Sequence, residues 1–214
     1  MTRLCVVCEG PTEANFVQQC LAQHLAVHGV YAYASIIQAP SGRHKGGRVT
    51  VERLVRHLSH EYRAFDRLTT LVDFYGFQDR DGRSRAEIEQ AILSGVQRCT
   101  TGLDTRFVLP YVQMHEFEGL LFADVAQFQW VLDGWNEEAR GALQQIRQAF
   151  DTPEDINDSP VTAPSKRLER IFAGTYSKTE HGPLIAEAIG LAHMRSQCPQ
   201  FDAWLKHLEN WGQM

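Results

Sequence analysis

The sequence predicts an α/β fold, with a mostly parallel sheet of about four strands flanked by helices and followed by a C-terminal helical appendage. Two observations support this prediction. Up to about residue 125, short apolar runs alternate with segments whose apolar residues recur at helical spacing. Beyond that point only helix-like segments follow. We therefore expect a core formed by residues 1–125 and a helical appendage, residues 126–214, packed on it.

Four segments have the apolar, β-branched pattern of strands buried in a parallel sheet. The first runs from Leu4 to Cys8, and Gly10 and Pro11 break it. The other three are Val30–Gln38, Thr69–Asp73 and Thr105–Met114.

Helical spacing connects these strands and fills the appendage. A helix is expected from Glu13 with Thr12 as its cap, and Ser165 is expected to cap a later helix that begins at Lys166. The remaining expected helices are Val49–Phe65, Arg85–Thr101, Phe128–Leu132, Asn136–Phe150, Lys166–Phe172, Pro183–Met194 and Gln200–Trp211.

The composition excludes several classes of protein. No apolar stretch approaches the roughly 18 to 20 residues of a membrane span, and no signal-peptide pattern precedes the first strand, so we expect a cytoplasmic protein. With a formal net charge of -5, any contact with an anionic polymer must come from local basic patches. Cys5 and Cys8 would point to opposite faces of a strand, which favours a structural role over a zinc site.

Carboxylates follow three of the predicted strands. Glu9 follows the first strand with Glu13 four residues on, Asp73 ends the third, and Glu116 and Glu118 come after the fourth. Parallel strands bring such ends to one edge of the sheet, and Mg²⁺ is held by a few carboxylates. The sequence therefore predicts a magnesium site, with His115 beside it. In the alternative interpretation, Glu9 caps a loop and Glu13 only favours the positive end of a helix.

Basic residues in three segments are candidates for contacts with substrate phosphates. One group lies in a Gly-rich loop, a second at the start of an expected helix, and a third between two expected helices. Ordinary solvated surface is the alternative for each group. These candidate substrate-binding residues are Arg43, His44, Lys45, Arg48, Lys166, Arg167, Lys178 and His181.

Six motifs, taken in order, resemble a bacterial family of unknown function numbered 4276. They are Val7–Glu13, Asp73–Gly76, His115–Phe122, Asp155–Pro160, Ala163–Arg167 and His181–Ile185. That family includes the Toprim nuclease subunit of the PARIS anti-phage system and is related to the Toprim half of OLD nucleases. The resemblance implies a Toprim-like catalytic core over residues 1–125.

The same resemblance implies a Mg²⁺-dependent nuclease, with Mn²⁺ as a substitute, acting on DNA or RNA in phage defence beside an AAA or ABC-type ATPase. It carries Glu9 and Glu13 over as an acidic pair and Asp73 as the first acid of an Asp-x-Asp motif. Tyr75 stands at the second position, so Glu116 or Glu118 would supply the missing charge. The expected catalytic residues are Glu9, Asp73, Glu116 and His115, and the expected metal ligands are Glu9, Glu13, Asp73, Glu116 and Glu118.

A rival interpretation is a non-catalytic Toprim-like module that binds nucleic acid or nucleotide and docks on an ATPase. An apolar stripe near the C-terminus bears on the partner, because it either covers the chain's own core or anchors an ATPase or a second copy of the chain. It consists of Phe201, Trp204, Leu205, Leu208 and Trp211.

Overall fold

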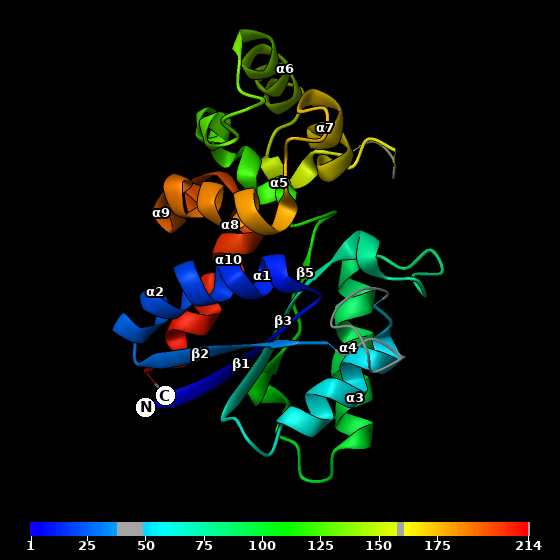
Figure 1. Cartoon of the computed structure of the whole chain (residues 1–214). Coiled ribbons are helices and arrows are strands. Elements are labelled where there is room, and N and C mark those ends of the chain that lie inside the picture. The colour runs from blue at the N-terminus through cyan, green and yellow to red at the C-terminus, as the bar shows by residue number, and fades with distance from the viewer. Residues whose placement is uncertain (38–48, 158–160, 214) are drawn as a thin grey trace.

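The computed structural model describes residues 1–37, 49–157 and 161–213, and its centre is a parallel sheet. The candidate phosphate-contacting loop with Arg43, His44, Lys45 and Arg48 lies outside the described residues. The strands are β1 (Thr2–Cys8), β2 (Val30–Ile36), β3 (Arg67–Asp73), β4 (Val108–Leu109) and β5 (Val112–Gln113). They are ordered β2-β1-β3-β4, with β5 also paired to β3, and every one of these pairings is parallel (Figure 1). The predicted fold class is confirmed.

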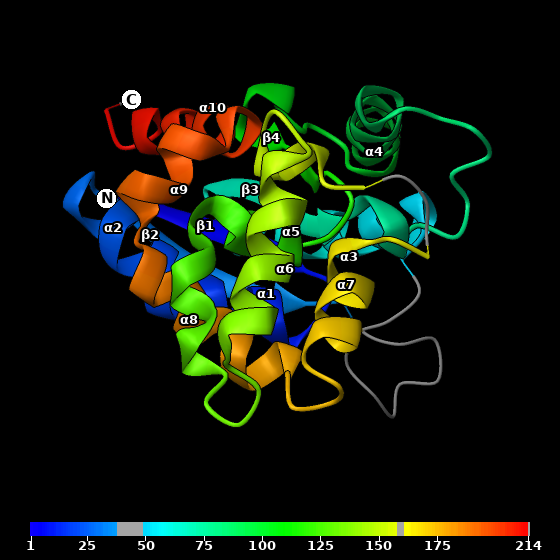
Figure 2. The ribbon, with the colours of Figure 1, turned by 90° about the horizontal axis from the view of Figure 1, so that it is seen from above.

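Side chains on both faces of β1 are apolar, and helices cover both faces of the sheet and keep these side chains from water. Leu4, Val6 and Cys8 belong to one buried cluster, whereas Cys5 and Val7 belong to another. The first cluster lies beneath α1 (Pro11–Phe16) and α2 (Ala22–Val27), which are joined by a π-helical turn, η1 (Val17–Leu21). The second lies beneath α3 (Val51–Glu61) and α4 (Arg85–Cys99) on the opposite face (Figure 2). Cys5 and Cys8 therefore face opposite layers, as the sequence predicted.

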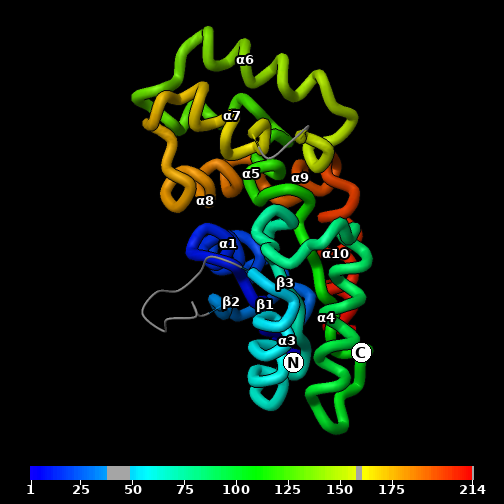
Figure 3. Tube along the Cα trace, turned by 90° about the vertical axis from the view of Figure 1, so that its right-hand side faces the viewer, coloured from blue at the N-terminus to red at the C-terminus, as the bar shows by residue number. Residues whose placement is uncertain are grey.

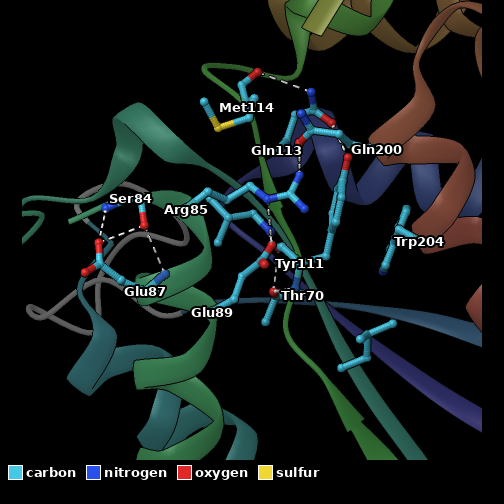
Figure 4. A network of polar contacts seen from close by, with 12 residues as sticks. Thr70, Ser84, Arg85, Glu87, Glu89, Tyr111, Gln113, Met114, Gln200 and Trp204 are labelled. Carbon is cyan, nitrogen blue, oxygen red and sulfur yellow. Dashed lines mark hydrogen bonds and ion pairs between the residues drawn. The ribbon is translucent and has the colours of Figure 1, made fainter.

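The predicted strand Thr105–Met114 is interrupted. A 3₁₀ turn, η3 (Thr105–Phe107), leads into β4, and Pro110 separates β4 from β5. Proline has no amide hydrogen to donate to a sheet. The Thr70 hydroxyl bridges the break, because it donates to the carbonyl of Tyr111 at 2.7 Å and accepts from the Tyr111 amide at 2.8 Å (Figure 4).

In the chain before β5, a 3₁₀ turn, η2 (Phe74–Gly76), follows β3. In the described residues after β5 the chain is helical, as predicted. The helices α8 and α9 are separated at Gly190, whose φ of 76° a helix does not allow. The boundary expected near residue 125 falls inside η4, so the division of the chain stays a proposal. The elements are α5 (Glu118–Leu121), η4 (Phe122–Trp130), α6 (Glu137–Gln148), η5 (Pro153–Asp155), α7 (Pro164–Ile171), α8 (Lys178–Ile189), α9 (Leu191–Gln197) and α10 (Pro199–Asn210).

The last helix, α10, packs on the sheet rather than projecting from it. Nε1 of Trp204 donates to the Thr69 hydroxyl at 2.9 Å, and the indole stacks on Tyr111 with ring centroids 4.6 Å apart. The Thr2 hydroxyl at the start of β1 donates to the carbonyl of Trp211 at 3.2 Å, which brings the two ends of the chain to the same part of the molecule (Figure 3). All five residues of the C-terminal apolar stripe are buried, so they cover the core and offer no exposed aromatic anchor to a partner.

None of the described helices is long and apolar enough to span a lipid bilayer.

Candidate active site

The turn between β1 and α1 positions the first two carboxylates. Gly10, rather than Thr12 as predicted, is the N-cap of α1, and its amide donates to the Glu13 carboxylate at 2.9 Å. Pro11 follows at the first helical position, where its missing amide hydrogen costs nothing. Glu13 is thus fixed beside Glu9 at the carboxyl end of β1.

Gly76 makes room for the carboxylate of Glu9. A Cβ atom on Gly76 would lie 2.2 Å from Oε2 of Glu9, a distance that any other residue would have to relieve by displacing the carboxylate. The same Oε2 is buried and has no hydrogen-bond partner among the described atoms. An unpaired buried carboxylate oxygen is costly, so this atom is suited to an additional ligand.

Asp73 ends β3 and holds the next acidic segment in place. Its Oδ1 accepts a hydrogen bond from the amide of Phe117 at 2.8 Å, and the Tyr75 amide donates to the carbonyl of His115 at 3.1 Å. His115 adopts a φ of 57°, in the left-handed region. The turn that carries Glu116 is therefore fastened to the end of β3.

Glu116 is held by Ser165, which the sequence predicted to be a helix cap. The amide and the hydroxyl of Ser165 donate to its two carboxylate oxygens at 2.8 and 3.0 Å. The expected cap role of Ser165 is wrong, because α7 begins at Pro164 after the N-cap Ala163 and the hydroxyl of Ser165 bonds Glu116 instead.

Glu118 is the first residue of α5 and is almost completely buried, with 1% exposure. Lys178, the first residue of α8, places its Nζ 3.1 Å from Oε1 of Glu118. The sequence predicted that helix to begin at Pro183, which would leave Lys178 outside it. Because α8 begins five residues earlier, Lys178 is directed at the carboxylates.

Burial and mutual repulsion perturb these acids together. Burial raises the pKa of Glu9, Glu13 and Asp73, and neighbouring carboxylates of the cluster raise it further. Burial also raises the pKa of Glu118, to about 7, although Lys178 opposes the rise. Burial by itself lowers the pKa of Lys178, but nearby carboxylates, chiefly that of Glu118, outweigh it, and the net shift is upward.

We call Glu9, Glu13, Asp73, Glu116 and Glu118 the carboxylate cluster. Its oxygen donors and surplus negative charge fit a hard divalent cation such as Mg²⁺. In the described part of the chain, three metal-ligating atoms within 4.8 Å of one another occur at His24, His28 and Glu209, and not in the carboxylate cluster. Coordination of one ion by Glu9, Asp73 and Glu116 therefore stays a prediction.

The other predicted site residues have different surroundings. The ring of His115 lies 5.3 Å from that of Tyr75, burial lowers its pKa, and its Nδ1 has no hydrogen-bond partner among the described atoms. Lys166 pairs with Glu169 at 2.8 Å on its own helix.

Two further candidates make local contacts. Nε of Arg167 donates to the carbonyl of Thr162 at 2.7 Å, and Nδ1 of His181 accepts from the amide of Ser177 at 2.8 Å. These contacts stabilise the chain around the site, and phosphate contacts by Arg167 and His181 stay predictions.

Sequence reasoning assigned no role at the site to Gly76, Ser165 or Tyr176. The hydroxyl of Tyr176 is buried with no hydrogen-bond partner among the described atoms, and burial together with Glu118 and Glu116 raises its pKa well above the ordinary value. No spacing or composition signal indicates these roles, because Gly76 and Ser165 lie against acids distant in sequence, and the charges that affect Tyr176 also come from distant acids. The motif Ala163–Arg167 contained Ser165 without indicating its contact with Glu116.

Comparisons with known proteins give a family and a structure. The family described as "Domain of unknown function (DUF4276)" matches residues 8–209. The C-terminal region of the OLD protein of Xanthomonas campestris pv. campestris is a similar solved structure, 18% identical with a TM-score of 0.45, over 100% of this chain and 97% of that chain. None of the curated proteins matches the chain.

Proposed function

The chain belongs to the domain of unknown function family DUF4276, and we propose that it is a Mg²⁺-dependent nuclease of the Toprim type. The observation that carries the proposal is the carboxylate cluster at the ends of β1, β3 and β5. Burial raises the pKa of the Glu9, Glu13, Asp73 and Glu118 carboxyls, and Lys178 lies against Glu118. Such a concentration of buried and half-buried acids costs folding free energy unless a cation is bound, which is typical of a functional site.

In this proposal the acids hold the cation and prepare water. Glu9, Asp73 and Glu116 would be the principal ligands, with Glu13 and Glu118 completing the negative surroundings. A bound Mg²⁺ would polarise the scissile phosphate and lower the pKa of an attacking water. In its alternative role Glu9 would act as the general acid or base, and burial raises the pKa of its carboxyl above the ordinary value.

Lys178 would contact the substrate. Its side chain is 42% exposed while its ammonium group pairs with Glu118, so it reaches both the cluster and the solvent. An ammonium group in this position can stabilise negative charge on a phosphate as bonds are made and broken. Ser165 positions Glu116 through its hydrogen bonds to that carboxylate. Asp73, besides its proposed role as a ligand, holds the turn that carries Glu116.

Cleavage of labelled single- and double-stranded DNA and RNA in Mg²⁺ or Mn²⁺ tests the proposal. We expect Glu9→Gln to lose cleavage at least a hundredfold with an unchanged circular dichroism spectrum. Glu137→Gln is the matched control, because Glu137 on α6 is 89% exposed and outside the cluster. Cleavage by Glu9→Gln at the wild-type rate would refute the assigned role and would point to a contaminating nuclease.

The second candidate is a binding module without catalysis, and Tyr75 favours it. Tyr75 stands where the resemblance places a second acid, and its hydroxyl is hydrogen-bonded to the side chain of Asn157. Wild-type protein that binds nucleic acid but cleaves none under any metal condition would establish this function. In either case we propose an AAA or ABC-type ATPase partner, tested by co-expression and size-exclusion chromatography. Separate elution with and without ATP, with full activity of the isolated chain, would exclude it.

A further inference from the structure

Two histidines and a glutamate gather away from the carboxylate cluster. His24 lies in α2, His28 follows that helix, and Glu209 lies near the end of α10. Nε2 of His24 is 2.6 Å from Oε1 of Glu209, and Nε2 of His28 is 3.8 Å from the same oxygen. The two imidazole centroids are 5.1 Å apart. Three side chains that are each partly exposed therefore direct ligand atoms at one point.

We propose that His24, His28 and Glu209 form a zinc site that links α2 to α10. Histidines four residues apart project from the same side of a helical turn, and a set of two histidines and one carboxylate is a common ligand set for Zn²⁺. Zinc binds nitrogen and oxygen ligands tetrahedrally at about 2.0 to 2.2 Å, which places ligand atoms about 3.3 Å apart. The observed separations of 2.6 and 3.8 Å lie on either side of that value, and all three ligand atoms lie within 4.8 Å of one another, so side-chain rotations would bring them to one ion.

The residues around the site hold the carboxylate of Glu209 in place. Arg195 donates to both oxygens of Glu209, at 2.5 and 3.2 Å, and its Nε donates to Asp202 at 2.6 Å. When Oε1 binds the ion, Arg195 keeps Oε2 and Asp202 as acceptors. Its positive charge lowers the affinity for zinc but fixes the carboxylate in place. Three protein ligands leave the fourth position of the ion to water.

Zinc at this position would join parts of the chain that are far apart in sequence. His24 and Glu209 are separated by 185 residues. Gly212 lies so close to the carbonyl of His28 that an added Cβ would be 1.7 Å from that oxygen, so the segment after α10 already rests on the turn after α2. An ion bound only in the folded state therefore stabilises the docking of α10.

The test measures binding of Zn²⁺ alone to the full chain without a histidine tag. Isothermal titration is performed with excess Mg²⁺, which competes for any site formed by carboxylates alone and leaves the histidine site available. We expect one Zn²⁺ per chain, a Zn²⁺-dependent rise in the unfolding temperature, and a Co²⁺ complex with visible absorption typical of tetrahedral coordination. His24→Ala and His28→Ala should each weaken Zn²⁺ binding at least tenfold.

His60→Ala is the matched control, because the side chain of His60 is 87% exposed on α3 and has no part in the cluster of three. It should bind Zn²⁺ like the wild type. If His24→Ala does not fold, His28→Gln replaces it, since the side chain of His28 is 35% exposed. Absence of a stoichiometric Zn²⁺ ion, or equal affinity in the wild type and both histidine variants, would overturn the proposal and leave the nuclease proposal unaffected.

Discussion

From the raised pKa of Glu118 we expect stability to fall as pH rises from 4.5 to about 7. Its carboxyl is buried, and its pKa is raised from 4.5 to about 7. A carboxyl that binds its proton more tightly in the folded state contributes stability that is fully present below pH 4.5 and is lost as pH rises through 7. At about 1.36 kcal/mol per pKa unit, this loss is about 3 kcal/mol. Burial raises the pKa of Glu9, Glu13 and Asp73 in the same direction.

Two histidines change the stability of the fold with pH in the opposite direction. Burial lowers the pKa of His57 and His115 below 6.5, so each destabilises the folded state at acid pH and ceases to do so as pH rises through 6.5. The wild-type profile therefore combines both effects. Glu118→Gln isolates one of them, because it removes the ionising group and leaves the shape of the side chain nearly unchanged.

Urea unfolding at pH 5 and pH 8, in EDTA, measures the free energy of unfolding at each pH. From pH 5 to pH 8 the wild type should lose about 2 to 3 kcal/mol more of its free energy of unfolding than Glu118→Gln does, because a small part of the loss has already occurred at pH 5. Glu137→Gln, on an exposed position of α6, should keep the wild-type profile. Addition of Mg²⁺ at pH 8 should restore stability to the wild type, since a cation offsets repulsion between the acids. Equal pH profiles in the wild type and Glu118→Gln would refute the reasoning.

Two further substitutions test the packing around the site. Gly76→Ala should displace the Glu9 carboxylate, lower Mg²⁺-dependent cleavage and cost about 1 to 3 kcal/mol of stability. Gly141→Ala, with open space at its Cβ on α6, should stabilise the chain by up to about 1 kcal/mol; a similar loss of cleavage in both variants would contradict the role of Gly76. Trp204→Ala should cost about 3 to 5 kcal/mol, and a fall of the unfolding temperature under about 3 °C would show that α10 contributes little to the core.

The alternation of strands and helices was predictable because burial on both faces leaves a direct pattern in the sequence. β1 is apolar at every position from Leu4 to Cys8, and its alternate side chains enter two different layers. Where the prediction was wrong, one residue changed the local hydrogen bonding. Pro110 divides the fourth predicted strand, and Gly190 divides a predicted helix into α8 and α9.

The candidate site was predictable only in its acids. Carboxylates at strand ends can be placed from local pattern, because parallel strands fix where those ends meet. Their partners depend on tertiary contacts that no local spacing encodes. Ser165 reaches Glu116 across 49 residues, and Lys178 was predicted as a phosphate contact without its ion pair to Glu118.

The residues of the candidate site lie far apart in the sequence, so they become available at different times during synthesis. Glu9 and Glu13 leave the ribosome more than 150 residues before Ser165 and Lys178. Since the late residues hold Glu116 and offset the charge of Glu118, a partly synthesised chain cannot assemble the complete site. Translation thus delays the arrangement proposed to cut nucleic acid until Lys178 has been made, and products truncated before it are expected to lack that arrangement.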